Sequence, residues 1–476
     1  MQEILETNVK NGAPAQENEN GKQEIISINP ARLAAVKIIS RFERSDAYLD
    51  KLMNKELRDS NLSSEDKALL TELVNGVIRW RWKLDWVLTG FYKGDYLKCL
   101  NIVKNALRVG LYQILFLERI PDHAAINEAV EIIKRIQGEK IAGIVNGVLR
   151  NIARNIENIR YPLKEEDIVY YYTIIHSHPR WMVKRWIDLF GEEQTVQLLE
   201  ANNQKPNIKV RINLLNTSIS EVIKELIDNG IEFRQSPFAP ESLEILTKGI
   251  DVASNNLFVT GKITIQDTSA YLATKLAFVQ PGQRILDLCS APGGKSFALA
   301  EQSNDSGKVI SVDKYASKLK IIQEGAKRLQ LKSIETLEAD ASVVEFDELF
   351  DVVFMDMPCS GLGTLTKKPD IKWKREREDM PFLVKSQREI MSNAVRFVKT
   401  GGALIYSTCT IDPEENEDNI TWFLSEHPEF EIDPAEKYLP GEICKNGFMQ
   451  TYPHIHKMDG AFAARLVRKQ EIMIKQ

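Results

Sequence analysis

The chain has 476 residues, of which 43% are hydrophobic and 27% are charged, values typical of about three globular domains. Its formal net charge of −5 argues against a uniformly basic nucleic-acid binder. Five cysteines with no Cys-x-x-Cys spacing predict neither a disulfide scaffold nor a structural zinc site, so we expect a reducing, cytoplasmic setting. No apolar run is long enough to predict a membrane span, and no leader pattern predicts export.

The charge is unevenly distributed along the chain. Residues 28–160 carry 22 Lys and Arg against 16 Asp and Glu, a local net charge of +6, so the remainder sums to −11. Residues 1–28 are polar and poor in aromatic side chains, which predicts a disordered tail. Any surface for a polyanion is therefore expected to be local.

Residues 29–162 are expected to form a bundle of helices. Asn29 followed by Pro30 is typical of a helix start. Ser63 with Asp66 three residues later predicts a second start. Apolar residues then recur at helical spacing, as at Leu69, Leu70, Leu73, Val74, Val77 and Ile78.

Residues 163–262 are expected to combine a helical linker with a small α/β domain. The helical patterns cover Pro179–Gly191, Glu192–Asn202 and Ile219–Asn229. The predicted strands are Ile208–Leu214, Ile231–Phe233 and Leu257–Thr260.

Residues 263–476 alternate short apolar runs with helical patterns. The runs are Ile285–Leu288, Val309–Asp313, Val352–Met355 and Ala403–Tyr406. This alternation predicts an α/β fold whose parallel sheet is covered on both faces.

A Gly/Pro-rich turn follows the first of these strands and opens a helix, where doubly wound folds bind ligands. It comprises Cys289, Ser290, Ala291, Pro292, Gly293, Gly294 and Lys295. Asp313 ends the next strand, where a carboxylate can bind a ribose diol. Asp340 follows the third strand and is placed to hold an exocyclic amine.

Three ligand classes compete for this turn. A phosphate-binding P-loop fits Gly294-Lys295-Ser296 but needs glycine where Cys289 stands. A dinucleotide site needs Gly-x-Gly-x-x-Gly, which is absent. An adenosine-bearing ligand without polyphosphate, such as S-adenosylmethionine, fits best, and an ordinary strand-to-helix turn is the remaining alternative.

Two cysteines follow later strands of the same sheet. Cys359 lies in Asp356-Met357-Pro358-Cys359, and Cys409 follows Thr408. An isolated cysteine is usually a small buried hydrophobe. Two at strand ends on the rim of the ligand turn favour a chemical role instead.

These segments resemble the RNA (cytosine-5)-methyltransferase family, the Nol1/Nop2/Sun proteins. The resemblance rests on Gly261–Ala270, Ile285–Ser296, Asp313, Asp340, Asp356–Gly361, Thr408-Cys409 and Asp459–Phe462. The N-terminal helices resemble the antitermination factor NusB. Three residues depart from the family pattern, and none removes a charged or nucleophilic group: Ser290, Met357 and Ala461.

The resemblance implies a Rossmann-like catalytic domain over 263–476, preceded by a NusB-like domain at 29–162 and an RRM-like domain within 163–262. It implies methylation of carbon 5 of a cytosine in 16S ribosomal RNA, with S-adenosylmethionine bound by the 289–295 turn, Asp313, Asp340 and Asp356. Cys409 would attack the base and Cys359 would assist release.

The remaining site residues, Asp356 and Lys295, are expected to contact the target cytosine. Asp356 would hydrogen-bond the cytosine edge, and Lys295 would reach the base or Asp356, unless it is a surface lysine at a helix start. The target base must be flipped or unpaired.

RNA contacts are predicted for two basic, aromatic tracts, Arg79–Lys83 and Lys367–Arg375. A buried core position for the tryptophans, with solvated charges, is the alternative. We expect a monomer that needs no metal and no membrane. A transfer-RNA methyltransferase and a non-catalytic RNA-binding assembly factor are the alternative functions.

Overall fold

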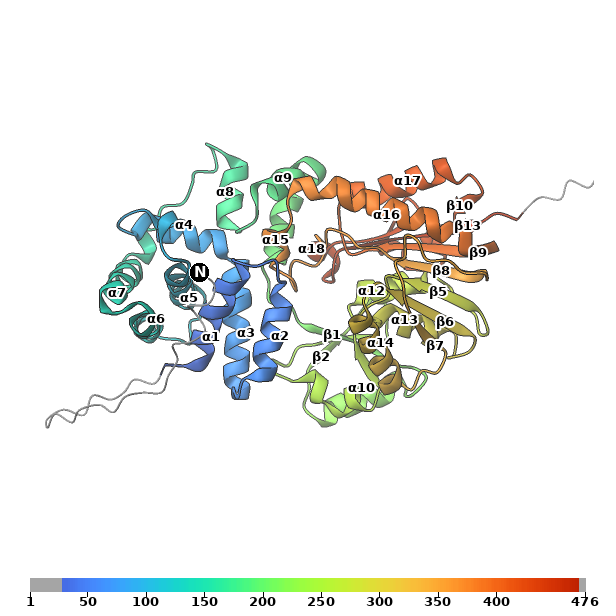
Figure 1. Ribbon diagram of the computed structural model, residues 1–476, viewed down its shortest axis with the longest axis horizontal. Helices are drawn as coiled ribbons and strands as arrows, with labels where there is room; N and C mark the ends of the chain where they lie inside the picture. Colours follow the sequence, from blue (N-terminus) through green and yellow to red (C-terminus); the bar gives the residue numbers. More distant parts are fainter. Residues whose placement is uncertain (1–27, 471–476) are drawn as a thin grey trace, which may run out of the picture.

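The computed structural model describes residues 28–470, so almost all of the predicted tail lies outside the described residues. A helical domain occupies one end of the molecule and a large sheet the other, with a small sheet beneath their junction (Figure 1). No helix among residues 28–470 is long and apolar enough to cross a membrane. Within the same range, no cluster of three or more His, Cys, Asp or Glu side chains is arranged to hold a metal ion.

The helical domain contains the predicted bundle. Its helices are α1 (Pro30–Phe42), α2 (Leu49–Asp59), α3 (Ser64–Arg79), α4 (Arg81–Phe91), α5 (Asn101–Phe116), α6 (Asp122–Gln137) and α7 (Glu139–Arg154). Both predicted starts are confirmed, because the side chain of Asn29 accepts from the backbone of Arg32 and that of Ser63 from Asp66. These bonds satisfy N–H groups that the first helical turn leaves unpaired.

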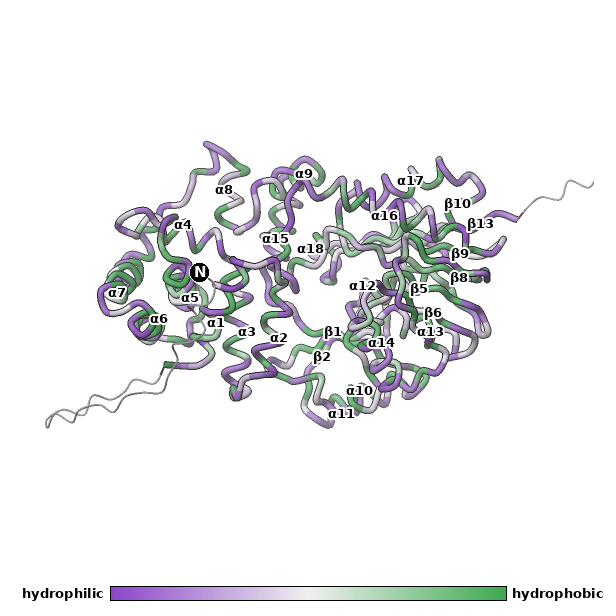
Figure 2. The backbone as a smooth tube through the Cα atoms, viewed as in Figure 1, coloured by the Kyte–Doolittle hydropathy of each residue, from purple (hydrophilic) through white to green (hydrophobic). Residues whose placement is uncertain are grey.

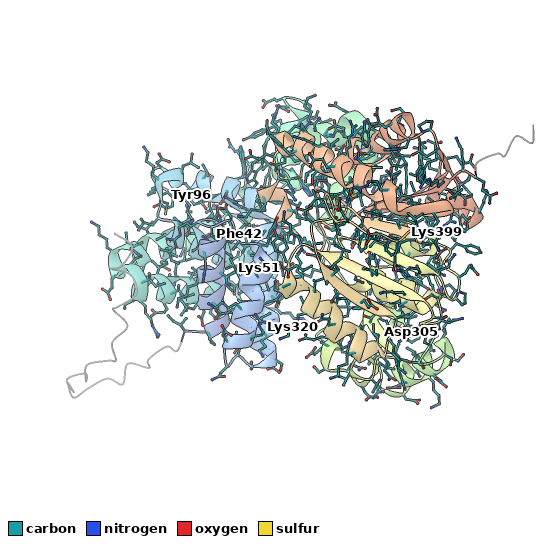
Figure 3. The ribbon with its side chains drawn as sticks, turned by 45° about the vertical axis from the view of Figure 1, so that its right-hand side comes forward. Phe42, Lys51, Tyr96, Asp305, Lys320 and Lys399 are labelled. Carbon is teal, nitrogen blue, oxygen red and sulfur yellow. The ribbon has the colours of Figure 1, made fainter. Side chains whose placement is uncertain are left out.

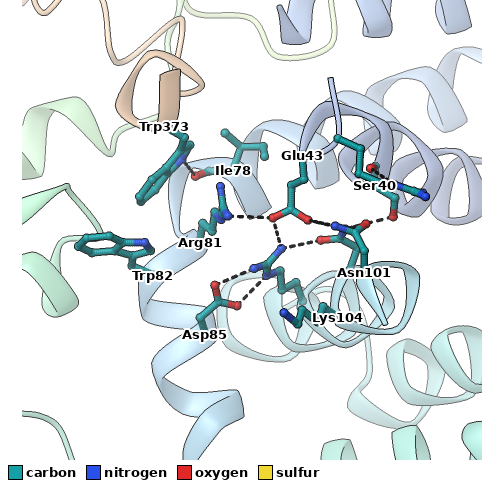
Figure 4. Close-up of polar contacts among 12 residues, drawn as sticks. Ser40, Glu43, Ile78, Arg81, Trp82, Asp85, Asn101, Lys104 and Trp373 are labelled. Atoms are coloured by element: carbon teal, nitrogen blue, oxygen red, sulfur yellow. Dashed lines mark hydrogen bonds and ion pairs between the residues drawn. The ribbon is translucent and has the colours of Figure 1, made fainter. Parts of the chain in front are cut away.

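A charged network is buried between the helices (Figure 4). Arg108 donates to Asp85 through Nε at 2.7 Å and to Glu43 through Nη1 at 2.6 Å. Arg81 pairs with the same Glu43 at 3.0 Å. Because each buried charge has an opposite partner, the network fixes how α1, α4 and α5 pack.

A helical linker leads to the small sheet. Helices α8 (Ile168–Ile175) and α9 (Arg180–Asn202) come first, and α9 is kinked at Gly191, where φ is 76°. The sheet is antiparallel with order β2-β3-β1-β4. Its elements are β1 (Ile208–Ile212), α10 (Ile219–Asp228), β2 (Phe233–Gln235), β3 (Ser242–Ile245), α11 (Asn256–Val259) and β4 (Ile263–Ile265).

The strand predicted at Leu257–Thr260 is wrong, because this segment is helix α11. The Asn255 side chain accepts from the backbone N–H of Leu257 and starts a helical turn. Local capping outweighs the β propensity of Val259 and Thr260.

The large sheet has the order β11-β12-β13-β9-β8-β5-β6-β7, and β10 pairs with β13. The strands are β5 (Arg284–Leu288), β6 (Lys308–Asp313), β7 (Ile334–Glu338), β8 (Phe350–Asp356), β9 (Val398–Thr408), β10 (Phe430–Ile432), β11 (Cys444–Lys445), β12 (Phe448–Thr451) and β13 (Ala461–Arg468). The helices around it include α12 (Thr268–Lys275), α13 (Gly294–Gln302), α14 (Ala316–Leu329), α15 (Ile371–Lys374), α16 (Met380–Ala394), α17 (Glu417–Glu426) and α18 (Pro453–His456). Its central strands are strongly hydrophobic (Figure 2).

The predicted α/β class is confirmed, but the sheet is mixed rather than wholly parallel. Strands β9, β8, β5, β6 and β7 run parallel, whereas β13 pairs antiparallel with β9. The parallel strands place their carboxyl ends at one rim, as the resemblance requires.

The two tracts predicted to bind RNA contact each other: Nζ of Lys372 donates to the carbonyl oxygen of Arg79 at 3.4 Å, and the Trp82 and Trp373 ring centroids are 5.5 Å apart. Lys372 is 1% exposed, and its Nζ donates to the carbonyl oxygen of Ser177 at 3.3 Å and to Oδ1 of Asn203 at 2.8 Å. Trp373 donates to the carbonyl oxygen of Ile78 at 2.8 Å (Figure 4). The prediction that Lys372 contacts RNA is therefore wrong, because this side chain joins the 367–375 loop to the helical domain.

Candidate active site

One cavity of about 910 Å³ opens at the carboxyl rim of the large sheet. Seven of the predicted site residues line it: Cys289, Ala291, Asp313, Asp340, Asp356, Cys359 and Cys409. They lie at the carboxyl ends of β6 and β8 and in the loops after β5, β7, β8 and β9, which the parallel arrangement brings to the same edge. The volume is near the upper end for a small-molecule pocket, so there is room for a cofactor and a base.

The conformation of the 289–295 turn depends on hydrogen bonds to β6 and on a glycine. The backbone N–H and Oγ of Ser290 both donate to the carbonyl oxygen of Val312, which ties the turn to β6. Gly293 has φ of +104°, and a Cβ there would lie 2.6 Å from the Phe297 ring. Only glycine fits at this point, so the residue is required for the turn itself.

The cavity suits an adenosine-bearing ligand with a charged amino-acid end. Asp313 is buried at the end of β6, with Oδ1 accepting from the backbone of Tyr315 at 3.1 Å. Asp340 accepts from Lys314, which is the main reason that its pKa falls to about 2. Asp287 has a fully buried Oδ1 with no hydrogen-bond partner among residues 28–470, and burial raises its pKa to about 7.

The two predicted cysteines form a close pair. Sγ of Cys359 and Sγ of Cys409 are 3.3 Å apart, and both residues are partly exposed in the cavity. The hydrogen bond from Cys359 lowers the pKa of Cys409, and the charges of Lys368 and Lys295 act in the same direction. The same hydrogen bond raises the pKa of Cys359. These opposite shifts favour Cys409 over Cys359 as the more readily ionised thiol of the pair.

Cys289 has a different environment. Burial and then the surrounding carboxylates raise its pKa to about 12. A protonated thiol in this position is a wall of the ligand site and not a nucleophile.

Lys295 and Asp356 form an ion pair at 2.7 Å. Burial alone would lower the pKa of Lys295, but Asp356 raises it above its ordinary value. The lysine side chain is 14% exposed, so the alternative of a surface lysine at a helix start is excluded. A fixed cation and a fixed acceptor thus lie together beside the cysteine pair.

Sequence reasoning missed the dipeptide that holds both cysteine loops. Glu415 accepts from the backbone N–H of Ser360 at 2.8 Å, next to Cys359. Asn416 accepts from the Thr408 hydroxyl at 2.6 Å and donates to the carbonyl oxygen of Thr410 at 3.1 Å, on either side of Cys409. Both residues are buried. The only sequence signal was polar residues soon after the Thr-Cys motif.

Replacing Asn416 with alanine should slow methyl transfer without preventing cofactor binding. Losing both bonds frees the Cys409 loop, and misplacing a reacting atom by 1 Å costs about a hundredfold in rate. Single-turnover kinetics and cofactor titration would separate the two effects. Asn155→Ala, on the helical domain, is the control. An unchanged rate for Asn416→Ala would remove the positioning role.

Comparison with known proteins covers nearly the whole chain. Residues 273–467 match the family described as 16S rRNA methyltransferase RsmB/F. Residues 29–154 match the NusB family, and residues 178–253 match the ferredoxin-like domain of RsmF/B-like methyltransferases. The three matches follow the chain in the same order as the three folded regions described above.

The relatives carry the same description over their full length. The "Probable ribosomal RNA small subunit methyltransferase B" of Bacillus subtilis (strain 168) is 37% identical over 443 residues, covering 91% of this chain and 98% of the relative. The "Ribosomal RNA small subunit methyltransferase B" of Klebsiella pneumoniae subsp. pneumoniae is 33% identical over 447 residues, covering 93% of this chain and 99% of the relative. The solved "Crystal Structure of PH0851" superposes with a TM-score of 0.77 at 27% identity, covering 94% of this chain and 100% of that one. The chain therefore belongs to the RsmB/F family of S-adenosylmethionine-dependent 16S rRNA methyltransferases.

Proposed function

We propose that this protein methylates carbon 5 of one cytosine in 16S ribosomal RNA through a covalent bond between Cys409 and the base. The observation that carries the proposal is the Cys359–Cys409 pair, with sulfur atoms 3.3 Å apart in the cavity that the 289–295 turn also lines. Neither a pure binding module nor an assembly factor needs a paired thiol and thiolate beside a cofactor site.

The residues that hold the cofactor are those of the cavity wall. Asp313 would bind the ribose, Asp340 the adenine amine, and the 289–295 turn the amino-acid end, with Asp356 nearby. When bound there, S-adenosylmethionine supplies the methyl group as an electrophile.

Carbon 5 of cytosine is a weak nucleophile until the ring is activated. Attack of the Cys409 thiolate on carbon 6 forms a C–S bond and moves electrons toward carbon 5. Lys295 stabilises the charge that develops in the ring, while Asp356 accepts a hydrogen bond from the base edge. The target cytosine reaches these groups only when flipped out or unpaired.

Release of the methylated RNA requires that the bond between Cys409 and carbon 6 be broken. After carbon 5 has taken the methyl group, its proton passes to a base, the C–H electrons restore the carbon 5–carbon 6 double bond, and Cys409 leaves as a thiolate. Cys359, whose Sγ lies 3.3 Å from that of Cys409 in the free protein, would donate a hydrogen bond to that thiolate.

Of the basic 367–375 loop, Lys368 is the most exposed lysine. Lys374 also lines the cavity, but its Nζ donates to the carbonyl oxygen of Ser45 at 2.6 Å. Lys367 is held by Asp267 and Asp459, and Lys372 is buried at the domain junction. Lys368 is exposed and lines the cavity with the cysteines. It is thus placed to contact a phosphate near the target base.

Lys368→Gln should weaken RNA binding and reduce its dependence on salt. Losing one phosphate contact lowers the slope of log Kobs against log salt by about 1. Lys332→Gln is the control, because it removes an exposed lysine just before the amino end of β7, away from the cavity. The backbone N–H of Lys332 donates to Asp305, which Figure 3 labels. Equal slopes for both variants would exclude a phosphate contact at Lys368.

The function is tested with the purified protein, S-adenosylmethionine and 16S RNA from a strain that lacks the enzyme. Bisulfite sequencing should show new 5-methylcytosine at one position. Methylation of transfer RNA alone would favour the first alternative, and cofactor binding without methylation of any RNA would favour an assembly factor. Parallel reactions with small-subunit particles would identify the preferred form of the substrate.

We further infer that the enzyme works as a monomer in the cytoplasm. One chain supplies both cysteines, the cofactor turn and the whole cavity wall. Two thiols this close need a reducing compartment to remain free.

A further inference from the structure

The catalytic cavity has a second wall, which comes from the helical domain. Tyr48 and Lys51, at the start of α2, line the same cavity as Asp356, Cys359 and Cys409. Figure 3 shows Lys51 on the side of the helical domain that faces the large sheet. More than 300 residues of sequence separate these side chains from either cysteine, so no motif could associate them.

This wall is fixed in place by a contact between the domains. Oδ2 of Asp370, in the loop after the Pro-Cys motif, accepts from the backbone N–H of Leu49 at 3.3 Å. Leu49 is the first residue of α2, and the helix has no side-chain cap of its own. A carboxylate at this position satisfies an unpaired N–H and interacts favourably with the helix dipole. The catalytic domain therefore supplies the cap that orients Tyr48 and Lys51.

The two side chains remain free for a ligand. Tyr48 is 51% exposed, unusual for a large ring in a cavity wall. Lys51 is exposed and forms no ion pair with any residue between 28 and 470. Asp50, on the same turn, also lines the cavity, and its negative charge adds to burial in raising the pKa of Asp370. An exposed ring beside an unpaired cation suits a base stacked next to its phosphate.

We propose that the first turn of α2 is an RNA clamp across the active site. Lys51 binds a backbone phosphate beside the target cytosine, and the Tyr48 ring stacks on a neighbouring base, which stabilises the flipped or unpaired state. The helical domain thus takes part in presenting the base to Cys409, in addition to any docking surface elsewhere on it. This inference rests on the proposed function, because it takes the cysteine pair as the reaction centre.

The test is steady-state kinetics with 16S RNA and measurement of cofactor affinity for Tyr48→Ala, Tyr48→Phe and Lys51→Glu. Tyr48→Ala should raise the KM for RNA about tenfold or more because it removes a stacked base, and Lys51→Glu should do the same because it replaces a phosphate contact with a repulsive charge. Tyr48→Phe keeps the ring and should stay near the wild type. Cofactor affinity should not change. Lys140→Glu, on α7 at the far side of the helical domain, is the charge control.

Asp370→Ala tests how the clamp is positioned. It should raise the KM for RNA as Tyr48→Ala does, and the two changes combined should cost little more than either alone, because they disable one element. Wild-type KM values for Tyr48→Ala and Lys51→Glu would overturn the clamp while leaving the methyltransferase proposal intact. A wild-type enzyme that methylates no RNA would overturn the proposed function instead.

Discussion

Replacing Cys409 with alanine should abolish methyl transfer to 16S RNA, lowering the single-turnover rate roughly 10⁴-fold or more, as expected when a covalent nucleophile is removed. The same variant should form no denaturation-resistant adduct with RNA carrying 5-fluorocytosine, in which fluorine prevents the final elimination. The residue is partly exposed and its loop is held by Asn416, so the protein should fold and bind S-adenosylmethionine normally.

Cys289→Ala is the matched control, because its thiol is in the same cavity but its pKa is about 12. That variant should still form the adduct. If Cys409→Ala forms it and Cys359→Ala does not, the roles of the two cysteines are reversed.

The pH dependence of methyl transfer follows from the Cys359–Cys409 pair. The rate depends on the fraction of Cys409 thiolate, which decreases as the pH falls through the pKa of this thiol. The hydrogen bond from Cys359 and the charge of Lys368 hold that pKa below its ordinary value. Activity should therefore persist to lower pH than for an isolated thiol. Lys368→Gln should shift the acidic limb of the profile to higher pH.

Local sequence signals were sufficient to predict most helices and strands, and to predict that the two cysteines lie at the carboxyl rim of the large sheet. The end of an apolar strand predicts where the next loop emerges, and parallel strands place such loops together. For this reason Cys359 and Cys409 could be placed on one rim, and the structure brings their sulfur atoms to 3.3 Å. Likewise, Asn29 and Ser63 cap the helices that their positions predict, because capping depends only on near neighbours.

Contacts between distant parts of the chain could not be predicted in this way. The 367–375 loop has the composition of an RNA-binding tract, yet Lys372 is buried between domains and donates to oxygen atoms that only the fold brings together. The capping of α2 by Asp370 spans 321 residues of sequence. Glu415 and Asn416 were overlooked for the same reason, since their partners are loop atoms whose positions depend on the assembled sheet.

Replacing Cys359 with alanine should produce the opposite defect from Cys409→Ala: the covalent bond forms, but the product is not released. Without a hydrogen-bond donor 3.3 Å from Cys409, the departing thiolate loses the group that stabilises it. Incubation with ordinary 16S RNA and S-adenosylmethionine should then give a protein–RNA band that survives denaturing electrophoresis, which the wild type should not show. The bound RNA should already carry the methyl group.

Two variants make this result specific. Cys359→Ser restores an O–H donor and should release more product than alanine does, while the double variant with Cys409→Ala should give no band. Removing Cys359 also takes away the main cause of the lowered Cys409 pKa, so the acidic limb of adduct formation should lie at higher pH than in the wild type. Normal turnover by Cys359→Ala would show that release proceeds without this thiol and that its contact with Cys409 serves only to activate the nucleophile.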